Sequence, residues 1–179
     1  MSRSVKLKEI VEAGQFDRAI QAAKEIESAW MRSLAFVEIA EVLGKAEQFD
    51  IAKQTFNLAI QAAKEIEDEW KRSSTLMEVA IASAKAGQFE IAIQAAKELE
   101  DKVERSLTLS LIAEALVEAG QFEIAIQVAK EIEDKAERSF TLSLIAEALT
   151  QAGQFERAFE VAETIEDSHL RPQALTDIK

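Results

Sequence analysis

Apolar residues recur along this chain with the periodicity of helices that bury one face. In the stretch 105–120, the i, i+3, i+4 and i+7 positions of one helix face are Leu109, Ile112, Ala113 and Leu116. The pattern predicts two alternating classes of helix joined by short turns. We expect first helices near 3–13, 29–46, 69–86, 102–119, 135–152 and 168–178. Second helices are expected near 16–27, 49–67, 89–100, 122–133 and 155–166.

The chain is an internal repeat. The stretch 105–134 returns 33 residues later as 138–167, with 22 of 30 positions identical. A fixed period of this length is typical of stacked helical hairpins. We therefore expect an all-α fold, a right-handed superhelix of about five 33-residue hairpins plus a terminal helix, forming one domain over 1–179. Its units lie near 1–28, 29–67, 68–100, 101–133 and 134–166, with the terminal helix at 167–179.

Two kinds of turn separate the helices. A Gln-Phe-acid motif follows Gly14, Glu47, Gly87, Gly120 and Gly153. Glycine suits the left-handed position just past a helix end because it has no Cβ, so the turn at Glu47 should be strained or differently built. The second kind ends in a residue that caps the next helix with its side-chain oxygen. Those residues are Ser28, Asp68, Asp101, Asp134 and Asp167.

One interval between these turns is 40 residues instead of 33, an insertion of seven in the second helix over 49–67. Seven residues make about two helical turns, so the apolar face is preserved. We expect one longer helix that projects beyond its neighbours or changes the pitch locally. The insertion is a functional landmark or neutral drift, and the sequence does not decide between them.

Charge and composition narrow the function. The net charge is −12, which opposes binding to nucleic acid and to anionic membranes. The acidic surface either keeps the protein in solution or selects basic partners. There is no cysteine, so disulfides and thiolate metal sites are excluded and a reducing compartment, the cytoplasm, is expected. No apolar run approaches the ~18 residues that a membrane span needs.

The sequence carries no pattern of catalytic chemistry. His169 is the single histidine and is expected at the surface. The motifs of phosphate-binding loops, zinc proteases and serine hydrolases are missing. Glutamate–lysine pairs four residues apart, Glu98 with Lys102 and Glu131 with Lys135, indicate helix support. We expect no enzyme activity, no cofactor and no metal.

An arginine recurs in the first turn of each first helix, where a cation opposes the helix dipole and needs a partner. These residues are Arg3, Arg32, Arg72, Arg105, Arg138 and Arg171. We expect ion pairs with the preceding turn, such as Arg138 with Asp134, the alternative being a ladder that receives a partner's carboxylates. Trp30 and Trp70 open two consecutive first helices and are expected to be packed, or alternatively to be exposed anchors.

The repeat resembles the tetratricopeptide family. A small residue in the first helix, a Gly-polar-aromatic turn and an alanine three residues later match at Ala113, Gly120, Phe122 and Ala125. The second copy adds the family's small-aromatic-small series on the second helix at Ala52, Phe56 and Ala59. The period is 33 instead of the family's 34, and the proline between repeats is missing. The resemblance implies a protein-binding scaffold in which the first helices line a concave face.

The residues that this resemblance places on the concave face are the candidate partner-binding site. They are Leu34, Val37, Glu41, Met77, Ile81, Leu107, Ser110, Glu114, Phe140, Ser143 and Glu147. Lys45, Ser74, Lys85, Glu118 and Gln151 continue the same surface. The expected function is a non-catalytic scaffold for a protein or peptide segment of basic and apolar character. The alternative is a self-assembling or spacer module that associates through its terminal repeats, and an engineered array or a piece of a longer one would also fit the regularity.

Overall fold

A computed structural model describes residues 9–11 and 13–178, and within these ranges it is helical with no strand. Residues 9–11 are helical and precede α2. The helices that follow are α2 (Phe16–Lys24), α3 (Ala29–Lys45), α4 (Phe49–Lys64), α5 (Glu69–Lys85), α6 (Phe89–Lys97), α7 (Lys102–Glu118), α8 (Phe122–Lys130), α9 (Lys135–Gln151), α10 (Phe155–Glu163) and α11 (Leu170–Asp177). The predicted all-α fold of successive helical hairpins is confirmed.

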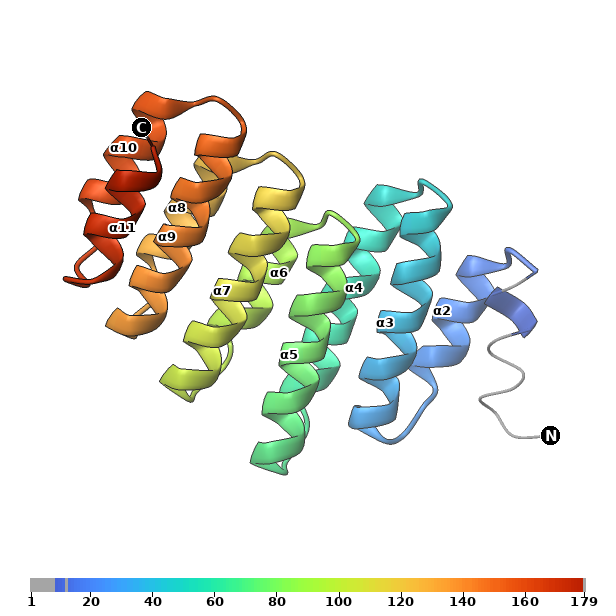
Figure 1. Ribbon diagram of the computed structural model, residues 1–179. Coiled ribbons are helices and arrows are strands. Elements are labelled where there is room, and N and C mark those ends of the chain that lie inside the picture. Colours follow the sequence, from blue (N-terminus) through green and yellow to red (C-terminus); the bar gives the residue numbers. More distant parts are fainter. Residues whose placement is uncertain (1–8, 12, 179) are drawn as a thin grey trace. The chain divides into compact units, whose positions relative to one another are not determined.

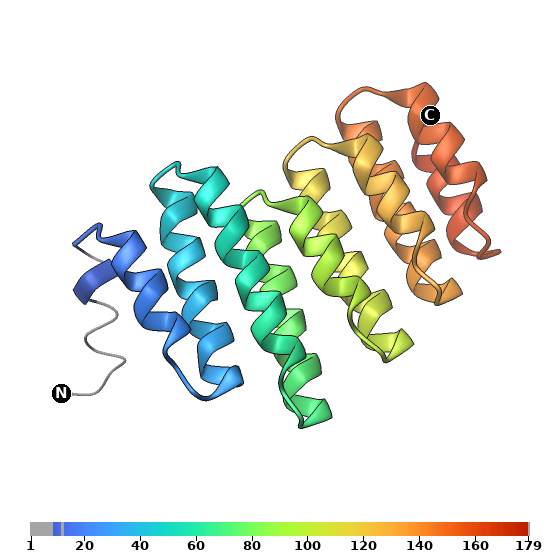
Figure 2. The same ribbon diagram turned by 180° about the vertical axis from the view of Figure 1, so that it is seen from behind.

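The chain divides into two compact units, 1–98 and 99–179. In unit 1, α3 packs on α4 and α5, and α4 also packs on α6. In unit 2, α7 packs on α8 and α9, and α9 packs on α10 and α11. Each unit therefore has two layers, with the first helices in front in Figure 1 and the second helices in front in the reverse view of Figure 2.

The cores lie between these layers and follow the predicted apolar periodicity. In unit 1 the largest fully buried side chains are Ile39, Leu43, Phe56, Leu76 and Val79. In unit 2 they are Leu99, Ile112, Leu116, Ile132, Ile145, Leu149 and Ile165. Alanines at or near zero exposure separate these residues on the second helices, which lets neighbouring helices approach closely.

The turn after each first helix has the same backbone at Glu47 as at the glycines. Glu47 has a φ of 59°, and Gly87 and Gly120 have φ values of 73° and 72°. Gln48 N donates to Leu43 O at 2.9 Å, which is the six-residue hydrogen bond of a Schellman motif. The expectation of a differently built turn is wrong. The expectation of strain holds, because a side chain with a Cβ is forced into the left-handed region.

The second helices end three residues earlier than predicted, at Lys24, Lys64, Lys97, Lys130 and Glu163. The reason is tertiary. Beyond Lys130 the chain turns so that Ile132 is 1% exposed in the core, with its N–H bonded to Ala129 O at 3.2 Å. Burying this side chain stabilises the turn more than one further helical turn of polar residues would. The same arrangement recurs at Ile66 and Ile165.

The insertion lengthens α4 to 16 residues, against nine in α6. The apolar face survives as predicted: Ala52, Phe56, Ala59 and Ala63 are fully buried. Phe49, at the start of the helix, is the exception and is exposed. The longer helix is confirmed, and the role of the insertion stays open.

Candidate functional site

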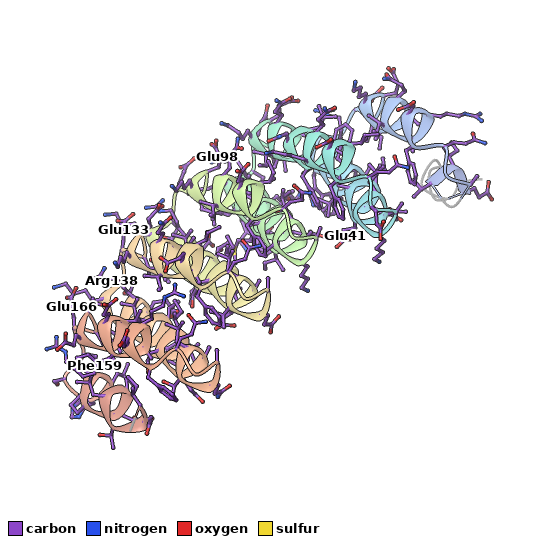
Figure 3. All side chains as sticks on the ribbon, turned by 90° about the horizontal axis from the view of Figure 1, so that it is seen from above. Glu41, Glu98, Glu133, Arg138, Phe159 and Glu166 are labelled. Carbon is purple, nitrogen blue, oxygen red and sulfur yellow. The ribbon has the colours of Figure 1, made fainter. Side chains whose placement is uncertain are left out.

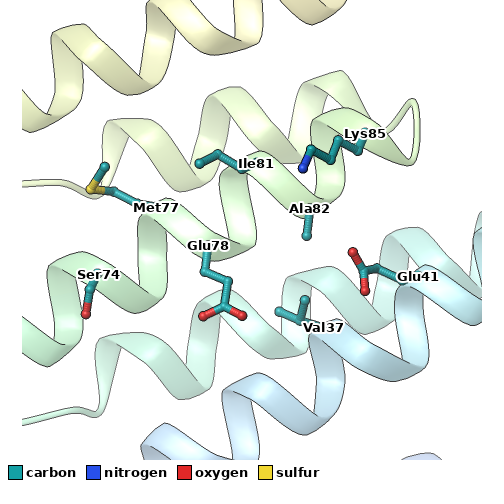
Figure 4. A pocket seen from close by; sticks show the side chains of 8 residues that line it. All are labelled: Val37, Glu41, Ser74, Met77, Glu78, Ile81, Ala82 and Lys85. Carbon is teal, nitrogen blue, oxygen red and sulfur yellow. The ribbon is translucent and has the colours of Figure 1, made fainter.

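The candidate residues of unit 1 meet in an open hollow between two first helices. The hollow has a volume of about 460 Å³ and its lining comes from α3 and α5 (Figure 4). Its residues are Val37, Glu41, Ser74, Met77, Glu78, Ile81, Ala82 and Lys85. We call it the α3–α5 hollow. Four of the candidate residues line it, together with the two flanking residues Ser74 and Lys85, whereas Leu34 is half-buried on α3 outside it.

The α3–α5 hollow is amphipathic and nearly balanced in charge. Met77 and Ile81 are half-buried and form its apolar floor with Val37. Two carboxylates, Glu41 and Glu78, and one ammonium group, Lys85, line the hollow (Figure 4). Sequence reasoning missed Glu78 and Ala82. Glu78 and Ala82 directly follow the predicted residues Met77 and Ile81 in α5. They line the hollow because α3 packs beside this side of α5.

Unit 2 has an equivalent hollow between α7 and α9, of about 410 Å³. It is lined by Glu114, Val117, Glu118, Thr141, Leu144, Ile145, Glu147, Ala148 and Gln151. We call it the α7–α9 hollow. Among the unit 2 candidates, Glu114 and Glu147 line this hollow. Leu107 and Phe140 lie nearer the helix N-termini and are 44% and 48% exposed.

The two serines predicted to contact a partner, Ser110 and Ser143, differ in their exposure to solvent. Ser110 is 3% exposed, and its Oγ lies 2.8 Å from Thr141 Oγ1, so the two hydroxyls hold α7 to α9. The prediction that Ser110 faces a partner is therefore wrong, because the neighbouring helix already covers and bonds it. Ser143 is half-buried.

The recurring arginine binds a carbonyl of the turn before its own helix and a glutamate at the end of its own repeat. The Arg138 guanidinium donates to Ile132 O at 2.6 Å and to Glu166 Oε1 at 2.7 Å (Figure 3). Arg105 likewise donates to Leu99 O and, at 2.5 Å, to Glu133 Oε1. These bonds satisfy carbonyls freed where the second helices end.

The predicted pair of Arg138 with Asp134 is wrong, because the Asp134 carboxylate caps α9 by accepting from Glu137 N at 2.8 Å. The ladder that would receive a partner's carboxylates is disfavoured as well, since Arg32, Arg105 and Arg138 already bind glutamates. Arg3 lies outside the described residues.

The glutamates that accept from these arginines have lowered pKa values. The hydrogen bond from Arg105, followed by that from Lys102, lowers the pKa of Glu133 below its ordinary value. The hydrogen bond from Arg138 does the same to the pKa of Glu166. Both carboxylates are structural partners and stay ionised at neutral pH.

Contrary to the prediction, Lys102 and Lys135 do not pair with the glutamates four residues before them but with glutamates farther along the chain. Lys102 Nζ lies 3.1 Å from Glu133, and Lys135 Nζ lies 3.8 Å from Glu166. The i, i+4 rule fails here because the second helix has ended before either lysine, so the paired positions do not share a continuous helix.

Both tryptophans are exposed, which contradicts the expectation of packed junction residues. Trp70 is 75% exposed and Trp30 is 44% exposed. At about 100° per residue, Trp70 lies roughly 120–140° around α5 from the buried Thr75 and Leu76. Lys71 Nζ lies 5.9 Å from the centre of the Trp30 ring, a cation–π contact between α5 and α3.

Over the described ranges, no group of three or more histidine, cysteine or acidic side chains is arranged to hold a metal ion. His169 is exposed, as predicted. Its backbone N–H donates to the Asp167 carboxylate at 2.8 Å. The hydrogen bond from Leu170 N, followed by that from His169 N, lowers the pKa of Asp167. Among the helices of the described chain, none is both long and apolar enough to cross a bilayer.

Comparison with known proteins yields likeness in structure. No family model matches the chain, and no curated protein matches it. Among solved structures, Ton1535 from Thermococcus onnurineus NA1 aligns over 99% of both chains, with 15% identity and a TM-score of 0.38. A likeness at this level carries no argument about function.

Proposed function

We propose that the protein is a non-catalytic scaffold that binds a segment of a partner protein on its first-helix face. By this face we mean the solvent-facing side of α3 and α5 in unit 1 and of α7 and α9 in unit 2. The observation that carries the proposal is that first-helix residues meet in an open hollow in each unit. Hollows with an apolar floor and a few charged groups suit side chains of a bound segment. The tetratricopeptide resemblance supports the same face.

The second-helix layer contrasts with this face because ion pairs link its neighbouring helices. Lys53 Nζ binds Glu90 Oε2 at 2.6 Å and Lys64 Nζ binds Glu98 Oε2 at 2.8 Å in unit 1. In the first-helix hollows, by comparison, no described cation forms an ion pair with Glu41, Glu114 or Glu147. These acids are open to a partner, and a basic-apolar protein segment is the ligand that we propose. Nucleic acid and membrane are not proposed as partners, and the cysteine-free composition supports a reducing compartment such as the cytoplasm.

Site-specific photo-crosslinking tests which face is used. A photoreactive residue is placed at Ile81 or Glu147 in the hollows, and at Gln94 or Gln127 on the exposed side of α6 and α8 as matched controls. In cells that make the protein naturally, we expect a discrete cross-linked protein from the hollow positions and none from the controls. Equal yields from both faces, or adducts from the second helices alone, would refute the proposal.

One observation favours self-assembly as a second candidate. On α10, Phe155 and Phe159 are 54% and 46% exposed; Phe159 is labelled in Figure 3. Their equivalents one repeat earlier, Phe122 and Ile126, are half-buried. A second copy stacked on α10 would cover these rings. If the protein self-assembles, its molar mass measured by light scattering should rise with protein concentration. The Phe159→Glu variant should then have the mass of a monomer. A monomer mass at every concentration eliminates this candidate.

A further inference from the structure

The first-helix face of unit 2 is divided into an apolar half and an acidic half. On α7, one stripe of positions at i, i+4, i+7 and i+11 runs Leu107, Leu111, Glu114 and Glu118. On α9, the equivalent stripe runs Phe140, Leu144, Glu147 and Gln151. These spacings are close to whole helical turns, so each stripe projects from one side of its helix. Because α7 packs beside α9, the two stripes lie next to each other in the same order.

The apolar half is open to solvent. Leu111 is 45% exposed, similar to Leu107 and Phe140, and Leu144 is half-buried at the edge of the α7–α9 hollow. Large side chains from two adjacent helices thus share one exposed end of the face. Contiguous exposed apolar side chains of this kind mark interaction sites.

The acidic half has no cation of its own. Glu114, Glu118 and Glu147 line the α7–α9 hollow, and none of them forms an ion pair within the described part of the chain. Glu147 Oε1 accepts a hydrogen bond from Gln151 Nε2 at 3.1 Å, which leaves its charge uncompensated. The α3–α5 hollow differs because it contains Lys85. Charge complementarity at the α7–α9 hollow therefore demands lysine or arginine side chains from the occupant.

The spacing of the two halves sets the length of the occupant. Seven residues of α7 separate Leu107 from Glu114, which is about 10 Å at a rise of 1.5 Å per residue. An extended segment connects the two halves with fewer ordered residues than a helix, which needs about seven at this rise. Three extended residues span about 10 Å.

We infer that the first-helix face of unit 2 takes an extended segment of a partner protein with a bulky apolar side chain at one end and lysine or arginine three to five residues away. The apolar side chain packs on Leu107, Leu111 and Phe140. The cations enter the α7–α9 hollow beside Glu114 and Glu147. This inference rests on the proposed scaffold function and adds the chemistry of the bound segment and its order along the face.

Two fluorescent peptides of equal composition and length test the order. One has the core sequence Phe-Gly-Ser-Lys-Arg, flanked by glycine and serine. In the other peptide, lysine and arginine stay adjacent, and the phenylalanine is moved to the opposite terminus, about ten residues away. Fluorescence anisotropy against the full chain at low salt should show about tenfold tighter binding of the first peptide. Equal affinities would overturn the inferred spacing.

Charge variants test the acidic half. The double substitution Glu114→Lys and Glu147→Lys should weaken binding of the Phe-Gly-Ser-Lys-Arg peptide about tenfold or more. The matched control, Glu156→Lys with Glu160→Lys, changes the net charge equally on exposed positions of α10 and should leave affinity within about twofold. Circular dichroism verifies that both variants are folded. Equal losses in both variants would show a non-specific effect of net charge and would overturn the inference.

The apolar half is tested by Leu107→Ser with Phe140→Ser, two exposed positions whose substitution leaves the core intact. We expect about tenfold weaker binding, with no change for a peptide of lysines and arginines alone. An unchanged affinity would overturn the role of the apolar half. If crosslinks form at Glu147 but neither peptide order nor these substitutions matter, the scaffold function stands and this inference fails. If crosslinking at the hollows fails, both fall.

Discussion

The strained turn at Glu47 offers a quantitative test of the repeat's local design. Glu47→Gly should stabilise unit 1, because the residue has a φ of 59° in a turn that is otherwise formed by glycine. The left-handed conformation costs a residue with a Cβ roughly 1–2 kcal/mol. Glycine recovers this energy but adds freedom to the unfolded chain, which costs about 0.4–1 kcal/mol. The expected net gain is therefore about 1 kcal/mol.

The same unit contains the matched control. Gly87 has a φ of 73°, and a Cβ built there meets no heavy atom within 4 Å. The substitution Gly87→Glu therefore changes backbone strain without a steric clash, and it should destabilise unit 1 by about the same 1 kcal/mol. Glu47→Gln retains the strain and removes the charge near the C-terminus of α3. It separates the helix-dipole effect from the backbone effect.

Urea unfolding followed by far-ultraviolet circular dichroism measures these differences as shifts in midpoint at constant slope. Native-state hydrogen exchange locates them, because the Gln48 amide is held by the hydrogen bond to Leu43 O at 2.9 Å. We expect slower exchange of this amide in Glu47→Gly. A loss of stability in Glu47→Gly, or an equal gain in Glu47→Gln, would show that backbone strain is not the cause.

Three further predictions concern contacts between repeats and the exposed tryptophan. Arg138→Met should lower the free energy of unfolding by about 1–3 kcal/mol, because the partly buried Ile132 carbonyl loses its donor. Measured by urea unfolding, Glu166→Gln should lose less stability than Arg138→Met. Added salt should restore little of the stability that Arg138→Met loses. The lowered pKa values of Glu133 and Glu166 mean that the folded state binds fewer protons than the unfolded state near their ordinary value of 4.5. Stability from these carboxylates is thus complete above about pH 5 and is lost as pH falls through their folded pKa values, so urea midpoints should fall with acid, and less so in Glu166→Gln. Trp70→Phe should leave stability within about 0.5 kcal/mol of the parent, and acrylamide should quench Trp70 emission efficiently, since its ring is exposed. A stability loss above that range would indicate that Trp70 is packed.

Much of the fold follows from the sequence because its causes are local. Helix faces appear as i, i+3, i+4, i+7 spacing, and the turn at Gly120 follows from its lack of a Cβ. Capping of α9 by Asp134 depends on residues within three positions. Most residues of the α3–α5 hollow, including Glu41 and Ile81, are among those that the tetratricopeptide resemblance places on one face of the first helices. Residues on one helix face share an environment wherever the helix packs.

The tertiary structure decided what depends on segments far apart in sequence. Arg138 binds Glu166, 28 residues away, instead of the nearby carboxylate, because packing of α10 on α9 brings the turn at the end of the same repeat beside it. Ser110 is removed from the candidate surface by Thr141, 31 residues away. The helix before Ile132 ends early since burial of that side chain outweighs local propensity. Sequence periodicity determines which face of each helix is apolar and is buried in the core, and only packing decides where two neighbouring first helices leave an open hollow between them.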